Sequence, residues 1–258
     1  MPEYKIIDEI TDETYAQLKE FFQENEEAPE VSLFIDCPGG NVFAALRIVN
    51  LIDNFKGKTI ARCGILVASS ASVVALACDE IRITKDTFMM IHKPWIAQTS
   101  GTAEELLSMA SLLEQAGKRI EELCTEKAKD ATTAAYWFAT GDTWFGYEEI
   151  LANFNGTTLI EEEPAPSSSI YIICNKLKSA PEALVALVAK LRAEEKEEED
   201  EENPKNTPDE ETPKEPDKET IVENPEEAPV EEPEETPEEE DNEYAKKVIA
   251  RAKALFII

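Results

Sequence analysis

The first 160 residues alternate short β-branched runs with segments whose apolar residues recur at helical spacing, and this alternation restricts the fold more than any other feature. The run VSLFID (31–36) leads through the glycine turn CPGG (37–40) into a helical segment over 42–52. KTIARCG (58–64) leads in the same way into a stretch of alanines and serines, which predicts a closely packed helix that begins near Ser69. Repeated strand–helix units of this kind predict an α/β domain.

Further elements complete this domain. EIRITKD and TFMMIHKP, which together span 80–94, predict two strands, and 102–130 predicts a long helix. The apolar residues of the long helix recur along one stripe, which contains Leu106, Met109, Ala110, Leu113, Ala116, Ile120 and Leu123. We expect residues 1–160 to form the working domain.

The rest of the chain divides by composition into three parts. Residues 161–193 open with the proline-marked break EEEPAPSSS and continue with strand-like SIYIIC and helical EALVALVAKLRAEEK, which predicts an appendage of uncertain docking. Residues 194–243 contain 26 acidic residues, four basic residues and eight prolines, and too few large apolar side chains to offset the entropy of ordering. We expect a disordered acidic linker there, and a short basic amphipathic helix over 244–258.

Charge argues against one large class of function. The chain has 25 basic and 55 acidic residues and a formal net charge of -30. Binding nucleic acid needs a basic surface that neutralises phosphates, so we do not expect a nucleic-acid partner.

Cysteine and histidine usage points to a reduced, metal-free protein. None of the five cysteines lies in a CxxC pair, and the acidic start MPEYKIIDEITDE does not resemble a signal peptide. The longest apolar run, 64–78, is too short and too rich in serine to span a membrane. His92 is the single histidine, so a zinc site with several histidines is excluded. We therefore expect a cytoplasmic protein without a membrane segment, a metal or another cofactor.

Three side chains with the chemistry of acyl transfer stand at the ends of predicted elements: Ser69, His92 and Asp142. A serine hydroxyl becomes a good nucleophile when a neutral imidazole takes its proton, and a carboxylate on the far ring nitrogen orients that imidazole. A tetrahedral intermediate also needs two amide donors, and the amides of Gly40 and Ser70 are the candidates.

Each of these residues also has a simpler interpretation. A serine in a small-residue helix can serve close packing, and a histidine at a strand end can be a core residue. Asp142 can cap the helix predicted for YEEIL, and Gly39 and Gly40 can form only a tight turn. The residues by themselves leave both interpretations open.

Four segments resemble the Clp protease proteolytic subunit and, more closely, its phage relatives, the Clp-like head maturation proteases. FIDCPGGNV resembles the SPGG loop of the family, VASSAS its nucleophile segment, MMIHKPW its M-I-H-x-P segment and GDTWFGYEEI its D-x-x-F-x-x-E-E segment. They occur in the family's order and cover roughly residues 3–155. The acidic tail has no counterpart in the compact subunit.

The resemblance implies a fold of Clp and crotonase type, with the long helix as a handle through which subunits or rings meet. It implies that Ser69 is the nucleophile, His92 the general base and Asp142 the orienting carboxylate, and that Gly40 and Ser70 form the oxyanion hole. It also implies an extended peptide substrate that is added as an extra strand. The candidate substrate-binding residues are Ile65, Leu66, Val67, Ala68, Trp95 and Ile96.

These implications favour a serine endopeptidase that forms a homo-oligomeric ring and processes phage capsid or scaffold protein, in the host cytoplasm or in the prohead. One alternative is a general cytoplasmic, ATP-dependent Clp proteolytic subunit, although a partnership with an AAA+ unfoldase is uncertain. A second is a non-catalytic structural or scaffolding protein that acts through its acidic tail. A crotonase-type acyl-CoA enzyme is a third, disfavoured because the imidazole triad would then be superfluous.

Overall fold

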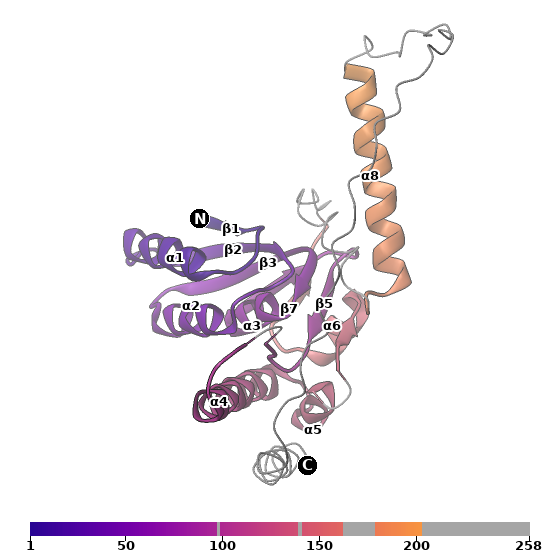
Figure 1. Ribbon diagram of the computed structural model, residues 1–258. Coiled ribbons are helices and arrows are strands. Elements are labelled where there is room, and N and C mark those ends of the chain that lie inside the picture. Colours follow the sequence, from indigo (N-terminus) through magenta and orange to yellow (C-terminus); the bar gives the residue numbers. More distant parts are fainter. Residues whose placement is uncertain (97–98, 139–140, 162–178, 203–258) are drawn as a thin grey trace, which may run out of the picture. The chain divides into compact units, whose positions relative to one another are not determined.

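The computed structural model describes residues 1–96, 99–138, 141–161 and 179–202 (Figure 1). Its strands form one sheet in the order β1-β2-β3-β4-β7, with β5 paired to the end of β3 and β6 paired to β5. All pairings are parallel except that of β5 with β6. The strands are β1 (Glu3–Ile6), β2 (Glu30–Cys37), β3 (Lys58–Ala68), β4 (Glu80–Ile83), β5 (Phe88–Ile91), β6 (Thr143–Phe145) and β7 (Thr157–Leu159).

Helices connect these strands, and the predicted α/β fold is confirmed. α2 and α3 lie along one face of β2 and β3, and α4 packs against α3 (Figure 1). The predicted long helix is α4, which begins after the capping residue Thr102 and ends at Lys127. The helices are α1 (Asp12–Glu24), α2 (Val42–Asn54), α3 (Ser70–Ala77), α4 (Ala103–Lys127), α5 (Ala131–Ala134), η1 (Ala135–Phe138), α6 (Tyr147–Asn153) and α8 (Glu182–Glu202).

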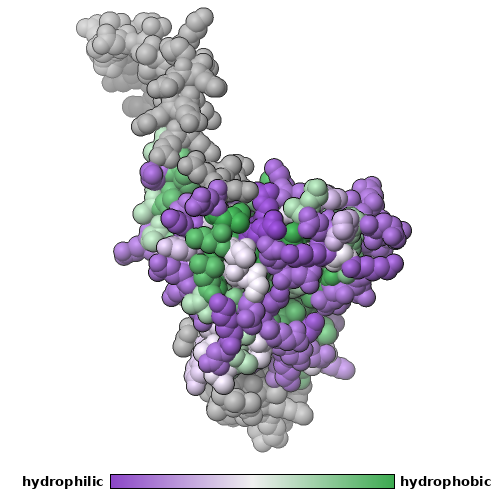
Figure 2. Space-filling view, turned by 180° about the vertical axis from the view of Figure 1, so that it is seen from behind, coloured by the Kyte–Doolittle hydropathy of each residue, from purple (hydrophilic) through white to green (hydrophobic). Residues whose placement is uncertain are grey.

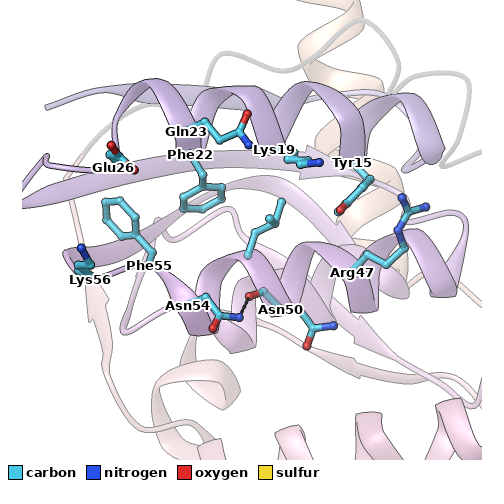
Figure 3. A pocket seen from close by; sticks show the side chains of 11 residues that line it. Tyr15, Lys19, Phe22, Gln23, Glu26, Arg47, Asn50, Asn54, Phe55 and Lys56 are labelled. Atoms are coloured by element: carbon cyan, nitrogen blue, oxygen red, sulfur yellow. Dashed lines mark hydrogen bonds between the residues drawn. The ribbon is translucent and has the colours of Figure 1, made fainter.

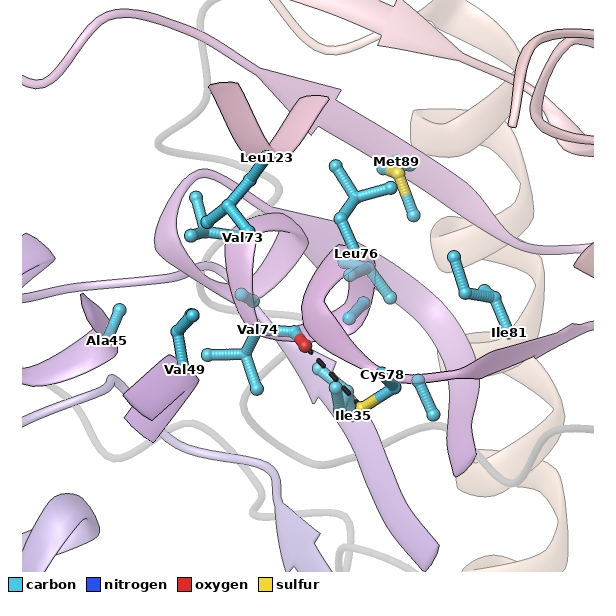
Figure 4. Close-up of a cluster of buried hydrophobic side chains, with 14 of the residues drawn as sticks. Ile35, Ala45, Val49, Val73, Val74, Leu76, Cys78, Ile81, Met89 and Leu123 are labelled. Carbon is cyan, nitrogen blue, oxygen red and sulfur yellow. Dashed lines mark hydrogen bonds between the residues drawn. The ribbon is translucent and has the colours of Figure 1, made fainter. Parts of the chain in front are cut away.

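The main hydrophobic core lies between the sheet and α2, α3 and α4. Small and β-branched residues of α3, such as Val73 and Val74, face the sheet and the neighbouring helices (Figure 4). At the C-terminal cap of α3, the Cys78 thiol donates to the carbonyl oxygen of Val74 (3.6 Å). Every residue of α3 except Ala77 is buried, as expected of a helix of alanines, serines and valines that approaches a sheet closely.

A second buried cluster covers the opposite face of β3. Side chains alternate between the two faces of a strand, so Val67 joins the main core whereas Leu66 and Ala68 point the other way. Leu184 and Val188 of α8 are buried in this cluster with Leu66, Ala68 and Met90. Ile65 also belongs to it and departs from the alternation, at the place where the pairing of β3 with β2 shifts register. The appendage predicted for 161–193 thus contains a helix that docks on the sheet.

The structure differs from the predictions at both ends of the chain. α8 continues to Glu202, so 194–202, predicted to be disordered, is helical. This stretch contains only Glu, Asp and Lys, which can all extend a helix, and the first proline follows at Pro204. At the other end, β1 and α1 had not been predicted: β1 has only four residues with one buried side chain, and α1 buries only Leu18 and Phe22. The predictions for 169–174, 203–243 and 244–258 lie outside the described residues.

Leu184→Ala should destabilise the protein by about 2–4 kcal/mol, because it removes buried methyl groups and leaves a cavity beneath α8. Leu184 is 0% exposed, whereas the neighbouring Val185 is 44% exposed and provides a matched control. Val185→Ala should change the free energy of unfolding by less than about 0.5 kcal/mol. Urea unfolding of the full chain measures both values, and equal small effects would contradict the docking of α8.

Candidate active site

The pairing of β5 brings three distant segments together. β5 runs parallel to β3, with Met90 opposite Ala68, so Ser69 emerges beside the end of β5. It runs antiparallel to β6, with Ile91 opposite Thr143. His92 directly follows Ile91 and Asp142 directly precedes Thr143, so the register carries these two side chains to one place.

Two hydrogen bonds join the candidate triad. Ser69 Oγ lies 2.7 Å from His92 Nε2, and His92 Nδ1 lies 3.1 Å from Asp142 Oδ1. An ionised carboxylate can only accept, so the ring proton sits on Nδ1 and is donated to Asp142. Nε2 is then free to accept the proton of the Ser69 hydroxyl. This is the arrangement that activates a serine for nucleophilic attack.

Ser69 sits on a sharp turn between β3 and α3. Its φ is 57°, a positive value that no other non-glycine residue of the described chain adopts. Its amide donates to the carbonyl oxygen of Met90 (2.8 Å), which ties the turn to β5. A nucleophile on a strained strand-to-helix turn presents its hydroxyl away from the backbone.

A glycine turn packs directly against this nucleophile turn. A Cβ atom on Gly39, whose φ is +99°, would come within 2.7 Å of Ser69 Cβ and 2.9 Å of the Ser70 amide nitrogen. Position 39 therefore needs glycine both for its backbone conformation and for this close approach. The CPGG turn and the turn at Ser69 are therefore in direct contact.

The two candidate oxyanion residues adjoin this contact, because Gly40 directly follows Gly39 and Ser70 directly follows Ser69. Ile10 forms a bridge with Gly40, in which the Ile10 amide donates to Gly39 O (2.7 Å) and the Asn41 amide donates to Ile10 O (2.8 Å). This bridge does not use the amide of Gly40. Ser70 is the first residue of α3, where backbone amides have no partner within the helix.

The neighbouring serines differ from Ser69 in their surroundings. The Ser72 hydroxyl is buried and bonded to the carbonyl oxygens of Val67 (2.8 Å) and Met90 (2.7 Å), which fixes it as part of the structure. Ser70 Oγ is buried with no hydrogen-bond partner among the described residues. Of the three serines, Ser69 is the one whose hydroxyl meets an imidazole.

The candidate substrate-binding residues fall into two groups. Trp95 and Ile96, after β5, are exposed and open to a ligand. Ile65, Leu66, Val67 and Ala68 are buried, and 66–68 already pair with β5 on one side while Val67 pairs with Cys37 on the other. Both edges of this strand segment are occupied, by β5 and by β2, and the assignment of 65–68 to the substrate site stays a prediction.

Two residues of the site were not anticipated from the sequence. Ser179 donates a hydrogen bond to Asp142 Oδ2, and Trp144 Nε1 donates to Ser179 Oγ (3.2 Å). Ser179 stands 37 residues beyond Asp142 in a segment without a motif. Only the docking of the C-terminal segment brings it to the triad, so no local sequence signal marks it.

The described cysteines are poor alternative nucleophiles. Burial raises the pKa of Cys37 to about 12, and Cys78 and Cys124 reach about 12 for the same reason. Burial also raises the pKa of Cys63. The thiolate is the reactive form of cysteine, so these four thiols remain unreactive at neutral pH.

Metal-binding clusters, membrane-spanning helices and pockets can be assessed within the described residues. No cluster of three or more His, Cys, Asp or Glu with metal-binding geometry occurs within it. None of the helices there is long and apolar enough to cross a membrane. A groove of about 390 Å³ lies between α1 and α2 (Figure 3), and no triad residue lines it. Its lining comprises Tyr15, Lys19, Phe22, Gln23, Glu26, Arg47, Asn50, Leu51, Asn54, Phe55 and Lys56.

Comparison with known proteins identifies the family. The family model for Clp protease matches residues 3–152. The ATP-dependent Clp protease proteolytic subunit of Streptococcus gordonii is 27% identical over 165 residues, which cover 57% of this chain and 81% of that protein. That of Streptococcus pyogenes serotype M1 is 25% identical over 148 residues, which cover 56% and 75%. The solved structure of a ClpP1 mutant from Listeria monocytogenes has the same fold, with a TM-score of 0.53 and 22% identity over 62% of this chain and 91% of that one. The chain belongs to the Clp protease family and is a serine-type peptidase of that family.

Proposed function

We propose that Ser69, His92 and Asp142 form the catalytic triad with which this protein hydrolyses peptide bonds. Ser69 Oγ attacks the carbonyl carbon of the substrate while its proton passes to His92 Nε2. The imidazolium then gives that proton to the leaving amine, which leaves an acyl-enzyme on Ser69. Water hydrolyses the acyl-enzyme with His92 acting again as the base, and Asp142 holds the ring throughout.

The observation that carries the proposal is the continuous pair of hydrogen bonds from Ser69 through His92 to Asp142, at 2.7 Å and 3.1 Å. These contacts suit a general base, because His92 Nε2 can accept the proton of the Ser69 hydroxyl while the bond from Nδ1 to Asp142 orients the ring. The amides of Gly40 and Ser70 flank the nucleophile turn, and we assign to them the stabilisation of the developing oxyanion.

The exposed residues Trp95 and Ile96 suit the role of a wall for an extended peptide. Both follow β5 within four residues of His92, so a substrate lying along them passes the triad. An extended peptide bound there gains main-chain hydrogen bonds and buries side chains against the indole ring.

α4 supports a proposal about assembly. Its buried residues, Ala116, Ile120, Leu123 and Cys124, all lie in its C-terminal half, whereas Leu106 and Leu112 are 40% and 47% exposed. The surface drawn in Figure 2 is mostly hydrophilic, with hydrophobic residues gathered in a few places. The N-terminal half of α4 thus offers apolar surface to a second copy of the chain, as expected of a homo-oligomeric ring.

The acidic extension supports a proposal about the substrate. Residues 153–258 lie outside the family match, and much of the net charge of -30 falls within them. We propose that the protein processes phage capsid or scaffold protein and that this extension directs it to the assembling shell. The competing possibility is general proteolysis with an AAA+ ATPase. The names of the streptococcal relatives, which describe them as subunits of an ATP-dependent protease, favour it.

Ser69→Ala should abolish cleavage of a fluorogenic peptide, by about 10⁴-fold or more, while leaving the fold intact. Ser70→Ala is the matched control, because it also removes one hydroxyl from the same turn but keeps the backbone amide. A fluorophosphonate probe should label the wild type at Ser69, as located by peptide mass mapping. Full activity of the Ser69 variant together with an inactive Ser70 variant would move the nucleophile to Ser70.

Leu106→Glu should convert the assembled protein into smaller species and lower its activity, because a charge replaces apolar contact area on α4. Gln115→Glu adds the same charge at another exposed position of α4 and should leave the assembly unchanged. Analytical ultracentrifugation separates the outcomes. An active wild-type monomer would contradict the proposed ring.

Deletion of 203–258, which keeps α8 whole, should change hydrolysis of a short peptide by less than about twofold, because all triad contacts remain. The same deletion should reduce co-sedimentation with a phage capsid or scaffold protein and the cleavage of that protein. Equal processing by both forms would contradict the targeting role. A gain in cleavage of folded proteins on adding an AAA+ ATPase would instead support the general protease.

A further inference from the structure

Asp142, as the candidate orienting carboxylate, is held from two sides. His92 Nδ1 binds Oδ1 at 3.1 Å, and the Ser179 hydroxyl donates to Oδ2. We propose that Ser179 is a positioning residue of the triad, which fixes Asp142 so that the carboxylate keeps the His92 ring in its working orientation. The proposal rests on the catalytic role assigned to Asp142 above.

Packing alone does not fix Asp142. Its side chain is 32% exposed, against 16% for His92. The preceding Gly141 has a φ of +95°, and a Cβ atom there would meet nothing within 4 Å, so the turn stands open. A carboxylate in such a turn rotates freely about its side-chain bonds unless hydrogen bonds hold both oxygens.

The direction of the Ser179 bond follows from its other partner. The Trp144 indole N–H can only donate, and it donates to Ser179 Oγ at 3.2 Å. The single hydroxyl proton of Ser179 is therefore left for Asp142. Trp144 is in turn placed by β6, where it pairs with Met90 of β5. The serine is thus held by the same strands that place the triad.

The segment that carries Ser179 is anchored by hydrophobic contacts. Ala180 packs against the second buried cluster, and Leu184 and Val188 of α8 lie inside that cluster against β3 and β5. Ser179 is three residues before the start of α8, so the docked helix fixes where its hydroxyl lies. All of these residues lie outside the family match at 3–152. This chain therefore supplies the contact from its own C-terminal extension.

Loss of the Ser179 hydroxyl should affect turnover rather than binding. Water can replace the hydrogen bond to the exposed oxygen but cannot hold the carboxylate in one orientation. Ser179→Ala should lower kcat by about tenfold, the effect of one hydrogen bond to a charged group, with KM unchanged within about twofold. Ser179→Thr keeps the hydroxyl and should retain most of the rate. Thr158→Ala, which removes an exposed hydroxyl on β7 that bonds to Glu80, is the matched control.

A double-mutant cycle separates positioning from a general structural effect. If Ser179 acts through Asp142, Ser179→Ala should slow labelling of Ser69 by a fluorophosphonate probe about tenfold in the wild type but less than about twofold in the Asp142→Ala background. Equal effects in both backgrounds would overturn the proposal, as would a Thr variant as slow as the Ala variant.

The single histidine provides a direct spectroscopic readout. Because His92 is the only histidine, histidine labelled with ¹⁵N gives one set of ring signals without assignment. The Nδ1 proton should exchange with solvent faster in Ser179→Ala and Asp142→Ala than in the wild type and in Ser179→Thr. Unchanged exchange and unchanged kcat in Ser179→Ala would overturn this inference alone, provided that Asp142→Ala is inactive. An active Asp142→Ala enzyme would instead overturn the triad on which the inference rests.

Discussion

The pairing of β5 on both edges is the constraint on which the active site depends. β5 contributes only four residues, yet its parallel bonds to β3 place Ser69 and its antiparallel bonds to β6 place Asp142. A slip of one residue on either side would turn every side chain of the strand to the opposite face. The buried Met89, Met90 and Ile91 prevent such a slip, because they pack into cores on two faces of the sheet. Hydrophobic packing therefore sets the alignment of polar groups that lie 23 and 50 positions apart.

The nucleophile turn is a second place where packing maintains an unfavourable conformation. A positive φ at a non-glycine residue costs roughly 1–3 kcal/mol, and Ser69 keeps it with a φ of 57°. The bond from its amide to Met90 O and the close contact with Gly39 help to hold the turn in this conformation. On the C-terminal side of Ser69, the turn is anchored by α3, which is almost completely buried. The strain is thus localised at the residue whose hydroxyl has to face the imidazole.

Local sequence patterns were sufficient to predict most elements of the domain, but not its long-range contacts. The strand–glycine–helix units, the long helix and the three triad candidates each carry a signal within a few consecutive residues, so they could be read from the sequence. The occupation of both edges of 65–68, by β5 on one side and by Cys37 of β2 on the other, could not, since an apolar run has the same pattern whether its edges are free or occupied. No sequence pattern marks Ser179. Its place depends on how Leu184 and Val188 dock, a long-range contact that periodicity does not report.

The docking of α8 links the stability of the C-terminal helix to the geometry of the triad. Leu184 and Val188 cover Leu66 and Ala68 directly before Ser69, and Ser179 at the head of the same helix reaches Asp142. One short segment thus contacts both the strand that leads to Ser69 and the carboxylate of Asp142. A helix that is attached to a domain through a few buried side chains opens locally at lower free energy than a buried strand. Opening of α8 would expose the apolar face of β3 and release Asp142 in one step, while the sheet and the Ser69 turn stay folded. If Asp142 and Ser179 have the roles proposed above, catalytic competence in this chain depends on the domain together with its extension, and not on the family-matched region alone.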